Sequence, residues 1–154
     1  MPIEDKLQEL GLVLHEAPKP IAAYVPCVRT GNLLVVSGQL PLSGQILLAK
    51  GKVPQQVPVE LAQAAAQQCV LNGLAILKAE LEGDWSRLKR VVRIGVFVQS
   101  NDDFDKQSQV ANGASELLEK LFGDAGRHAR AAVGVNALPL GAAVEVEFLF
   151  EIAD

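Results

Sequence analysis

The segment near the carboxyl end of the chain alternates between apolar and polar positions. In residues 144–152, VEVEFLFEI, one side carries Val144, Val146, Phe148, Phe150 and Ile152, and the other carries Glu145, Glu147, Leu149 and Glu151. A period of two residues is that of a β-strand with one apolar and one polar face. On spacing alone, Glu145 would lie on the exposed face of an edge strand. The apolar face restricts the chain to folds in which other elements cover one side of a sheet.

Upstream, apolar spacing and turn residues divide the chain into helices and strands. The predicted elements are a short amphipathic helix at 2–10, a loop at 18–26 running into a strand, a β-hairpin from 27–30 and 33–37, an irregular loop at 38–58 holding a short strand at 46–48, a helix at 59–82, a strand at 88–99, and a helix at roughly 102–122. Ser100-Asn101-Asp102 offers the second long helix an N-cap, and Gly123 ends it. Residues 128–148 are interpreted as two strands joined by a Leu138-Pro139-Leu140-Gly141 turn, an apolar hairpin.

This order predicts one α+β domain covering residues 1–154. Its arrangement is β-β-α-β-α-β-β, with two helices on one face of a mixed sheet and the short helix at the amino end. No internal repeat or linker interrupts the order.

Charge and composition exclude several classes of partner. A net charge of −4 and a pI near 5.2 oppose a general nucleic-acid surface, and the basic cluster Arg87, Lys89, Arg90 and Arg93 is interpreted as a solvated or interface face. The amino end does not resemble a signal peptide, and no apolar run approaches the roughly 20 residues of a membrane span. We therefore expect a cytoplasmic protein with no nucleic-acid or membrane partner. Cys27 and Cys69 lack CxxC spacing, and buried reduced thiols are expected.

Two charges lie among small and apolar residues, Arg130 in HARAAVGV and Glu145 in GAAVEVEF. An unpaired charge is costly to desolvate, so each needs a partner or a task. The planar guanidinium fork suits a substrate carboxylate. The structural alternative is a salt bridge between Arg130 and Glu145. His128, on the same predicted face as Arg130, is interpreted as a structural or partly exposed histidine, and His15 as a surface residue.

The sequence VSGQLP, residues 36–41, is the second candidate segment. A Ser37-Gly38 step at a strand end can present a hydroxyl and approachable backbone N–H groups to a ligand. The alternative is a β-bulge or a plain strand terminus. Nucleophile elbows, Walker and EF-hand motifs and metal-ligand spacings are absent from the sequence, so we expect no metal and no cofactor.

Three segments in order, AYVP, VSGQLP and ARAAVGV…LPLGAAVEVE, resemble the Rid family, the YjgF-like imine deaminases also labelled L-PSP endoribonucleases. The resemblance covers Tyr24 to Glu147 and implies a chorismate-mutase-like fold. It also implies a homotrimer with sites between subunits, where Arg130 and Tyr24 come from neighbouring chains. By position, Arg130 matches the family's carboxylate-binding arginine and Glu145 its water-holding glutamate. Tyr24, Ser37 and Gly38 match pocket residues, and Asn112 is the candidate for the family's helix asparagine.

Ala132 departs from the family pattern, because the characterised deaminases usually carry a cysteine two residues after the arginine. The chain therefore resembles a divergent branch. If the family's cysteine acts mainly through its backbone N–H and its shape, Ala132 preserves the site. If the thiol determines which substrate binds, the substrate of this chain differs. Three functions follow: hydrolysis of a 2-imino or enamine acid to a 2-keto acid and ammonia, non-catalytic binding of a small carboxylate as a sensor, and, least favoured by the acidic charge, RNA cleavage.

Overall fold

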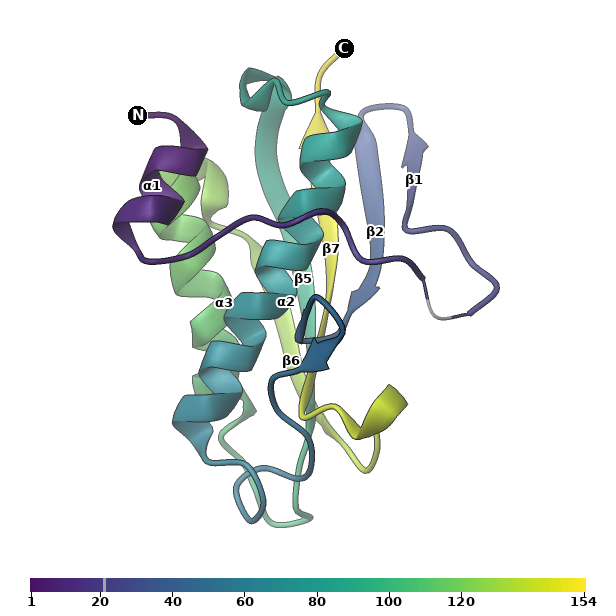
Figure 1. Ribbon diagram of the computed structural model, residues 1–154, viewed down its shortest axis with the longest axis vertical. Coiled ribbons are helices and arrows are strands. Elements are labelled where there is room, and N and C mark those ends of the chain that lie inside the picture. The colour runs from purple at the N-terminus through teal and green to yellow at the C-terminus, as the bar shows by residue number, and fades with distance from the viewer. Residues whose placement is uncertain (21) are drawn as a thin grey trace.

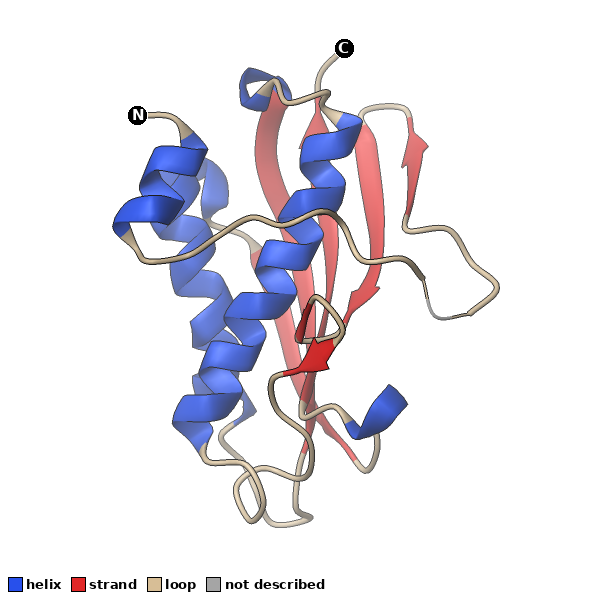
Figure 2. Cartoon of the chain, in the orientation of Figure 1, coloured by secondary structure: helices blue, strands red, loops and turns tan. Residues whose placement is uncertain are grey.

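Two long helices cover one face of a mixed β-sheet (Figure 1). The computed structural model describes residues 1–20 and 22–154; Ile21, within the predicted loop at 18–26, lies outside them. The helices are α1 (Ile3–Glu9), α2 (Val59–Glu80) and α3 (Gln107–Phe122), and the strands are β1 (Cys27–Thr30), β2 (Leu33–Gln39), β3 (Leu42–Ser43), β4 (Ile46–Leu47), β5 (Leu88–Gln99), β6 (Ala129–Val135) and β7 (Val144–Ile152). Figure 2 shows these elements coloured by type. The predicted α+β arrangement, with both long helices on one face and α1 added, is confirmed.

The strand order in the main sheet is β1-β2-β7-β5-β6, in which β5 and β6 are parallel and the other pairs antiparallel. Two expectations were therefore wrong. Strand β7 is central rather than an edge strand, and β6 and β7 do not form a hairpin, because β5 lies between them. The physical reason is the β5-α3-β6 crossover, which places β6 parallel to β5 on the outer side. The chain then returns past 138–141 to the other side of β5.

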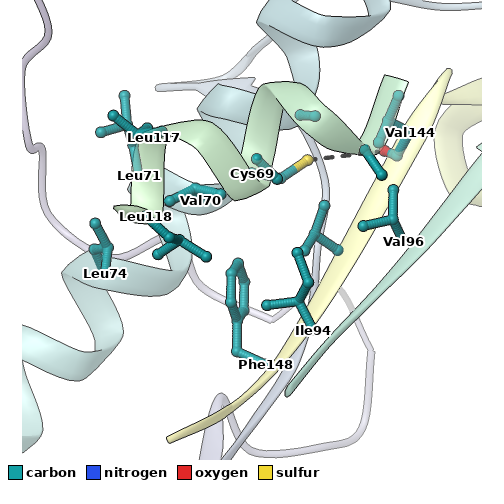
Figure 3. Close-up of a cluster of buried hydrophobic side chains, with 14 of the residues drawn as sticks. Cys69, Val70, Leu71, Leu74, Ile94, Val96, Leu117, Leu118, Val144 and Phe148 are labelled. Carbon is teal, nitrogen blue, oxygen red and sulfur yellow. Dashed lines mark hydrogen bonds between the residues drawn. The ribbon is translucent and has the colours of Figure 1, made fainter. Parts of the chain in front are cut away.

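The core lies between the sheet and the helices. Figure 3 shows Cys69 and Leu74 of α2 packed over Ile94 of β5 and Phe148 of β7. The apolar positions of β7 are all buried, as their alternation predicts. Cys69 is fully buried and its thiol donates to the Val144 carbonyl at 3.9 Å; Cys27 is also a free thiol but only partly buried. The expectation of buried, reduced thiols holds fully for Cys69 alone.

The amino end of α3 differs from the prediction. The helix begins at Gln107, and Ser100-Asn101-Asp102 does not cap it. The Ser100 hydroxyl instead donates to the Val98 carbonyl at 3.0 Å, and the Asn101 amide exchanges hydrogen bonds with Gln55. Because the Asn101 side chain and the backbone contacts of Ser100 and Asn101 with Val53 tie the end of β5 to the 51–57 loop, residues 101–106 form a turn before the helix starts.

The predicted loop at 38–58 contains a small β3–β4 ribbon, one strand more than expected. The buried Asn72 of α2 holds the start of this ribbon, since its Nδ2 donates to the carbonyls of Leu40 at 3.0 Å and Leu42 at 2.9 Å. The ribbon thus stays against the helix next to the end of β2.

The basic cluster on β5 is mostly solvent-exposed. Lys89, Arg90 and Arg93 are exposed, and Arg93 Nη1 lies 3.6 Å from Glu147 Oε1. Bulges between Leu88 and Arg90 and between Val91 and Arg93 interrupt the pairing of β5 with β7. None of the helices in residues 1–20 and 22–154 combines the length and apolar character needed to cross a membrane.

Candidate functional site

Glu145 lies on the face of the sheet opposite the helices. Its neighbours Val144 and Val146 are buried beneath the helices, so the alternation of β7 directs the carboxylate to the open face. There it is half-buried in a pocket. The lining residues come from the 18–26 segment, the end of β2, the start of the ribbon and the 3₁₀ turn before β7: Pro18, Lys19, Pro20, Tyr24, Pro26, Gly38, Gln39, Leu40, Leu42, Pro139 and Glu145.

Gly38 makes room for this carboxylate. The pairing of β2 with β7 shifts between Val36 and Gln39, so Gly38 lies in an irregular stretch of the strand. A Cβ at residue 38 would overlap Oε1 and Cδ of Glu145. The irregular pairing agrees with the β-bulge interpretation of the Ser-Gly step, and the lack of a side chain on Gly38 admits the Glu145 carboxylate against the backbone.

The surroundings of Glu145 make it a stronger base than an ordinary glutamate. Burial raises the pKa of its carboxyl group, and the negative charge of Glu147, two residues along the same face, raises it further. Among the described residues, no side chain or backbone N–H donates a hydrogen bond to the Glu145 carboxylate, and no cation pairs with it. Such a carboxylate can accept a proton from water or a ligand in the pocket.

Ser37 and Tyr24 are linked through the segment before β1. The Ser37 hydroxyl donates to the Val25 carbonyl at 2.7 Å, and its N–H donates to the Pro26 carbonyl at 2.9 Å. Ser37 is not among the pocket-lining residues; its bonds hold the segment that carries Tyr24. Tyr24 lines the pocket and is 47% exposed. The expectation that the Ser37 hydroxyl faces a ligand is replaced by a supporting contact.

Arg130 lies on the other face of the sheet, at the edge strand β6. It pairs with the buried Ile94 of β5 and points toward α3, where its Nη1 donates to Asn112 Oδ1 at 2.9 Å and to Ser115 Oγ at 3.0 Å. Ala132, two residues along the same face, packs against the core. The structure thus brings Asn112 directly to Arg130, a contact that the sequence did not predict.

Ser115 and His128 continue this contact. Ser115 Oγ lies 2.9 Å from His128 Nε2, and His128 Nδ1 lies 2.7 Å from the Gly126 carbonyl. Sequence reasoning placed His128 on the face of Arg130 but missed Ser115. The available signal was helical spacing, because Ser115 follows Asn112 by three residues and shares its helix face.

The predicted residues therefore form two groups. Tyr24, Gly38 and Glu145 meet in one pocket on the open face, while Arg130 and Asn112 meet at the edge of the helix-covered face. The alternative of an Arg130–Glu145 salt bridge is wrong, since the sheet separates the two side chains. Within the part of the chain that the structure describes, no group of three or more His, Cys, Asp or Glu side chains is placed to hold a metal ion.

Comparisons with known proteins agree with this architecture. The sequence model of the family described as Endoribonuclease L-PSP matches residues 14–152. Protein TCP17 of Trypanosoma cruzi is 48% identical over 147 residues, which cover 95% of this chain and 91% of that protein. The crystal structure of Atu1372 from Agrobacterium tumefaciens, a protein of unknown function, is 46% identical and superposes with a TM-score of 0.93 over 98% of this chain and 92% of that one.

A third relative carries a name that states an activity. The 2-iminobutanoate/2-iminopropanoate deaminase of Dermatophagoides farinae is 30% identical over 136 residues, covering 88% of this chain and 91% of that protein. All three similarities extend over most of the sheet and both long helices.

Proposed function

This chain belongs to the endoribonuclease L-PSP family, also called Rid or YjgF, and from that membership and the two groups of residues we propose that it hydrolyses small 2-imino or enamine acids to 2-keto acids and ammonia. The single observation that carries the proposal is the convergence of Tyr24, Gly38 and Glu145 in one pocket, with a carboxyl group of raised pKa. The name of the mite relative supports the choice of substrate class.

The proposed site combines residues of two copies of the chain. A 2-imino acid presents a carboxylate and, next to it, an electrophilic C=N carbon. Arg130 binds the carboxylate, and Glu145 of a neighbouring copy holds a water against that carbon. Because Arg130 and Glu145 face opposite sides of one sheet, the edge of one copy has to meet the open face of the next. We expect a closed homotrimer, in which each of three identical interfaces holds one site.

The open face of the sheet has the side chains that such an assembly needs. Val28 of β1, Val35 of β2 and Val133 of β6 are 54%, 46% and 45% exposed. Val28 pairs with Val35, so these two lie side by side on that face. The adjacent pair Val28 and Val35 near one edge and Val133 at the other edge support an open face that is covered in the assembled protein.

The proposed reaction is a hydrolysis that needs only proton transfers. Glu145 accepts a proton from the attacking water as its oxygen adds to the C=N carbon, and the imine nitrogen takes up a proton from solvent to become an amine. The protonated Glu145 then gives its proton to that amine, which leaves as ammonia with the C–N bonding pair, while the hydroxyl proton passes to solvent and the C–O bond becomes a carbonyl. Imines also hydrolyse in water, so positioning of substrate and water provides most of the acceleration expected here.

The test is the release of ammonia and 2-keto acid from 2-aminoacrylate generated in situ from serine by a dehydratase. Wild type should accelerate release, whereas Arg130→Ala and Glu145→Ala should each abolish the acceleration. Arg29→Ala is the matched control, because it removes an exposed guanidinium from the opposite edge strand, where Arg29 pairs with Asp154.

Three other results would contradict the proposal. If wild type gives no acceleration but binds a 2-keto acid in a manner that Arg130→Ala abolishes, the protein is a binding module. RNA cleavage that Arg130→Ala removes would favour the ribonuclease. In a crystal soaked with a 2-keto acid, a carboxylate bound anywhere but at Arg130 would overturn the site assignment.

A further inference from the structure

The hydrogen bonds of Arg130 leave one edge of its guanidinium free. Both N–H groups of Nη1 are engaged, one by Asn112 and one by Ser115, whereas Nε and Nη2 have no acceptor among the described residues. A guanidinium binds a carboxylate with two parallel N–H···O bonds from one edge. The Nε/Nη2 edge is therefore the one that remains for a ligand.

With His128 neutral, the chain of hydrogen bonds behind Arg130 has one consistent direction. The Gly126 carbonyl can only accept, so His128 Nδ1 carries the hydrogen that it receives. In a neutral imidazole the other nitrogen is then an acceptor, and Nε2 takes the Ser115 hydroxyl hydrogen. The lone pairs of Ser115 Oγ consequently face Arg130 and accept from Nη1.

Burial favours the neutral form of His128 that this direction requires. Desolvation lowers the pKa of the imidazole, and the charge of Arg130, two residues farther along the chain, lowers it further. The Gly126 carbonyl and Glu119 of α3 oppose this shift but do not reverse it. Arg127 also lines the hollow around His128 and adds a second positive charge to its surroundings.

The carbonyl at the far end of the chain is itself fixed by packing. Gly126 is buried, and a Cβ there would overlap the carbonyl of Leu118 on α3. The backbone of the 3₁₀ turn Gly123–Gly126 therefore lies directly against the helix that carries Asn112 and Ser115. His128 is therefore fixed by the Gly126 carbonyl at Nδ1 and by the Ser115 hydroxyl at Nε2.

We propose that His128 and Ser115 are positioning residues that hold the Nη1 side of Arg130, so that its Nε/Nη2 edge is preset to receive a substrate carboxylate. This rests on the proposed function, because it assigns Arg130 the role of carboxylate anchor. An arginine side chain that is already fixed loses less conformational entropy when the ligand binds. Neither positioning residue needs to touch the substrate.

The test measures the affinity for 2-oxobutanoate by calorimetry and the separate effects on KM and kcat. His128→Leu and Ser115→Ala should each weaken binding about 3- to 10-fold, the equivalent of one freed side chain at roughly 0.5–1.5 kcal/mol, and should raise KM more than they lower kcat. His128→Gln, whose amide oxygen can replace Nε2 as acceptor, and Ser115→Thr, which keeps the hydroxyl, should stay within about twofold of wild type. His15→Leu, an exposed histidine far from β6, is the matched control.

The outcomes separate this inference from the proposed function. If wild type does not bind 2-oxobutanoate, both are overturned. If wild type binds, Arg130→Ala does not, and both His128→Leu and Ser115→Ala bind like wild type, the positioning role is overturned while the function stands. The ¹⁵N spectrum of the imidazole gives a ligand-free check: a neutral ring with the hydrogen on Nδ1 is expected at pH 7.5. A hydrogen on Nε2 would overturn the inference even if His128→Leu does not fold.

Discussion

Arg130 and Glu145 lie on opposite faces of one sheet, on strands that flank β5 from either side. The side chain of Arg130 reaches Asn112 of α3, whereas that of Glu145 reaches the backbone of β2 at Gly38. A single chain therefore has half of the proposed site at its edge and the other half on its open face.

Mixing two inactive variants should restore activity. If each site takes Arg130 from one copy and Glu145 from its neighbour, refolding equal amounts of Arg130→Ala and Glu145→Ala chains together gives intact sites at about one interface in four. Deaminase activity should then approach about a quarter of wild type. Each variant refolded alone should be inactive. Activity that stays at the level of the single variants would show that both residues act within one copy.

Removing the charge of Glu147 should change the pH profile of the reaction. Glu145 has to be ionised to accept a proton, so activity falls as the pH drops through its raised pKa. Because Glu147 contributes to that rise, Glu147→Gln should move the acidic limb of kcat/KM to lower pH. Glu151→Gln, which removes a carboxylate farther along the same face, is the control. A shift of the acidic limb to higher pH in Glu147→Gln would contradict this assignment of the base.

Neutralising Glu145 should stabilise the folded protein while it abolishes activity. A raised pKa means that folding favours the protonated form, so the destabilising effect of the carboxyl group develops as the pH rises from its unfolded pKa through its folded pKa. Glu145→Gln should therefore melt higher than wild type at pH 7.5, and this difference should disappear near pH 4. Since the group is about half exposed, the gain should stay below about 1 kcal/mol, or roughly 2–4 °C in Tm. A lower Tm at pH 7.5 would mean that an unseen partner stabilises the ionised carboxylate.

Gly38→Ala should damage the pocket through a steric clash. The new methyl group would overlap the Glu145 carboxylate, which has to turn away or push β2 outward. We expect a loss of about 1–3 kcal/mol of unfolding free energy, typical of overpacking, together with loss of activity. Denaturant unfolding and the deaminase assay measure the two effects. Gly44→Ala controls for the removal of a glycine, since Gly44 has open space around it, although its positive φ adds some strain. Wild-type activity in Gly38→Ala would contradict the close approach of Glu145 to β2.

Asn72→Ala should loosen one wall of the pocket from beneath. The variant removes the two Asn72 Nδ2 hydrogen bonds to the carbonyls of Leu40 and Leu42, which keep only the Leu42 N–H and Gln68 Nε2 as donors, and both residues line the Glu145 pocket. Each lost hydrogen bond contributes about 0.5–1.5 kcal/mol, so unfolding should occur at lower denaturant concentration. Hydrogen exchange of the 40–48 amides should also become faster. Exchange that speeds up equally throughout α2 and β7 would instead indicate a general loss of stability.

Local chemistry determined much of this protein. The alternation of residues 144–152 predicted the buried and polar faces of β7, apolar spacing predicted the two long helices and their side of the sheet, and Leu88–Gln99 formed a strand as expected. These features depend on residues that are close together along the chain, so they can be predicted from the sequence alone. The family resemblance named Asn112 as a candidate site residue but not its contact with Arg130, and helical spacing from Asn112 would have added Ser115.

Tertiary structure decided what depends on partners distant in sequence. A strand pattern does not state which strand lies beside it, so the sequence alone suggested a β6–β7 hairpin where β5 intervenes. Likewise, Ser100 and Asn101 resemble a helix cap in the sequence. In the structure this segment makes long-range contacts with the 51–57 loop, so α3 begins only at Gln107. Strand order also sets Arg130 at an edge and Glu145 at the centre, on opposite faces. The sequence therefore identified Arg130 and Glu145 as candidate site residues. Their placement on opposite faces of the sheet depends on which strands pair, and only the tertiary structure shows this pairing.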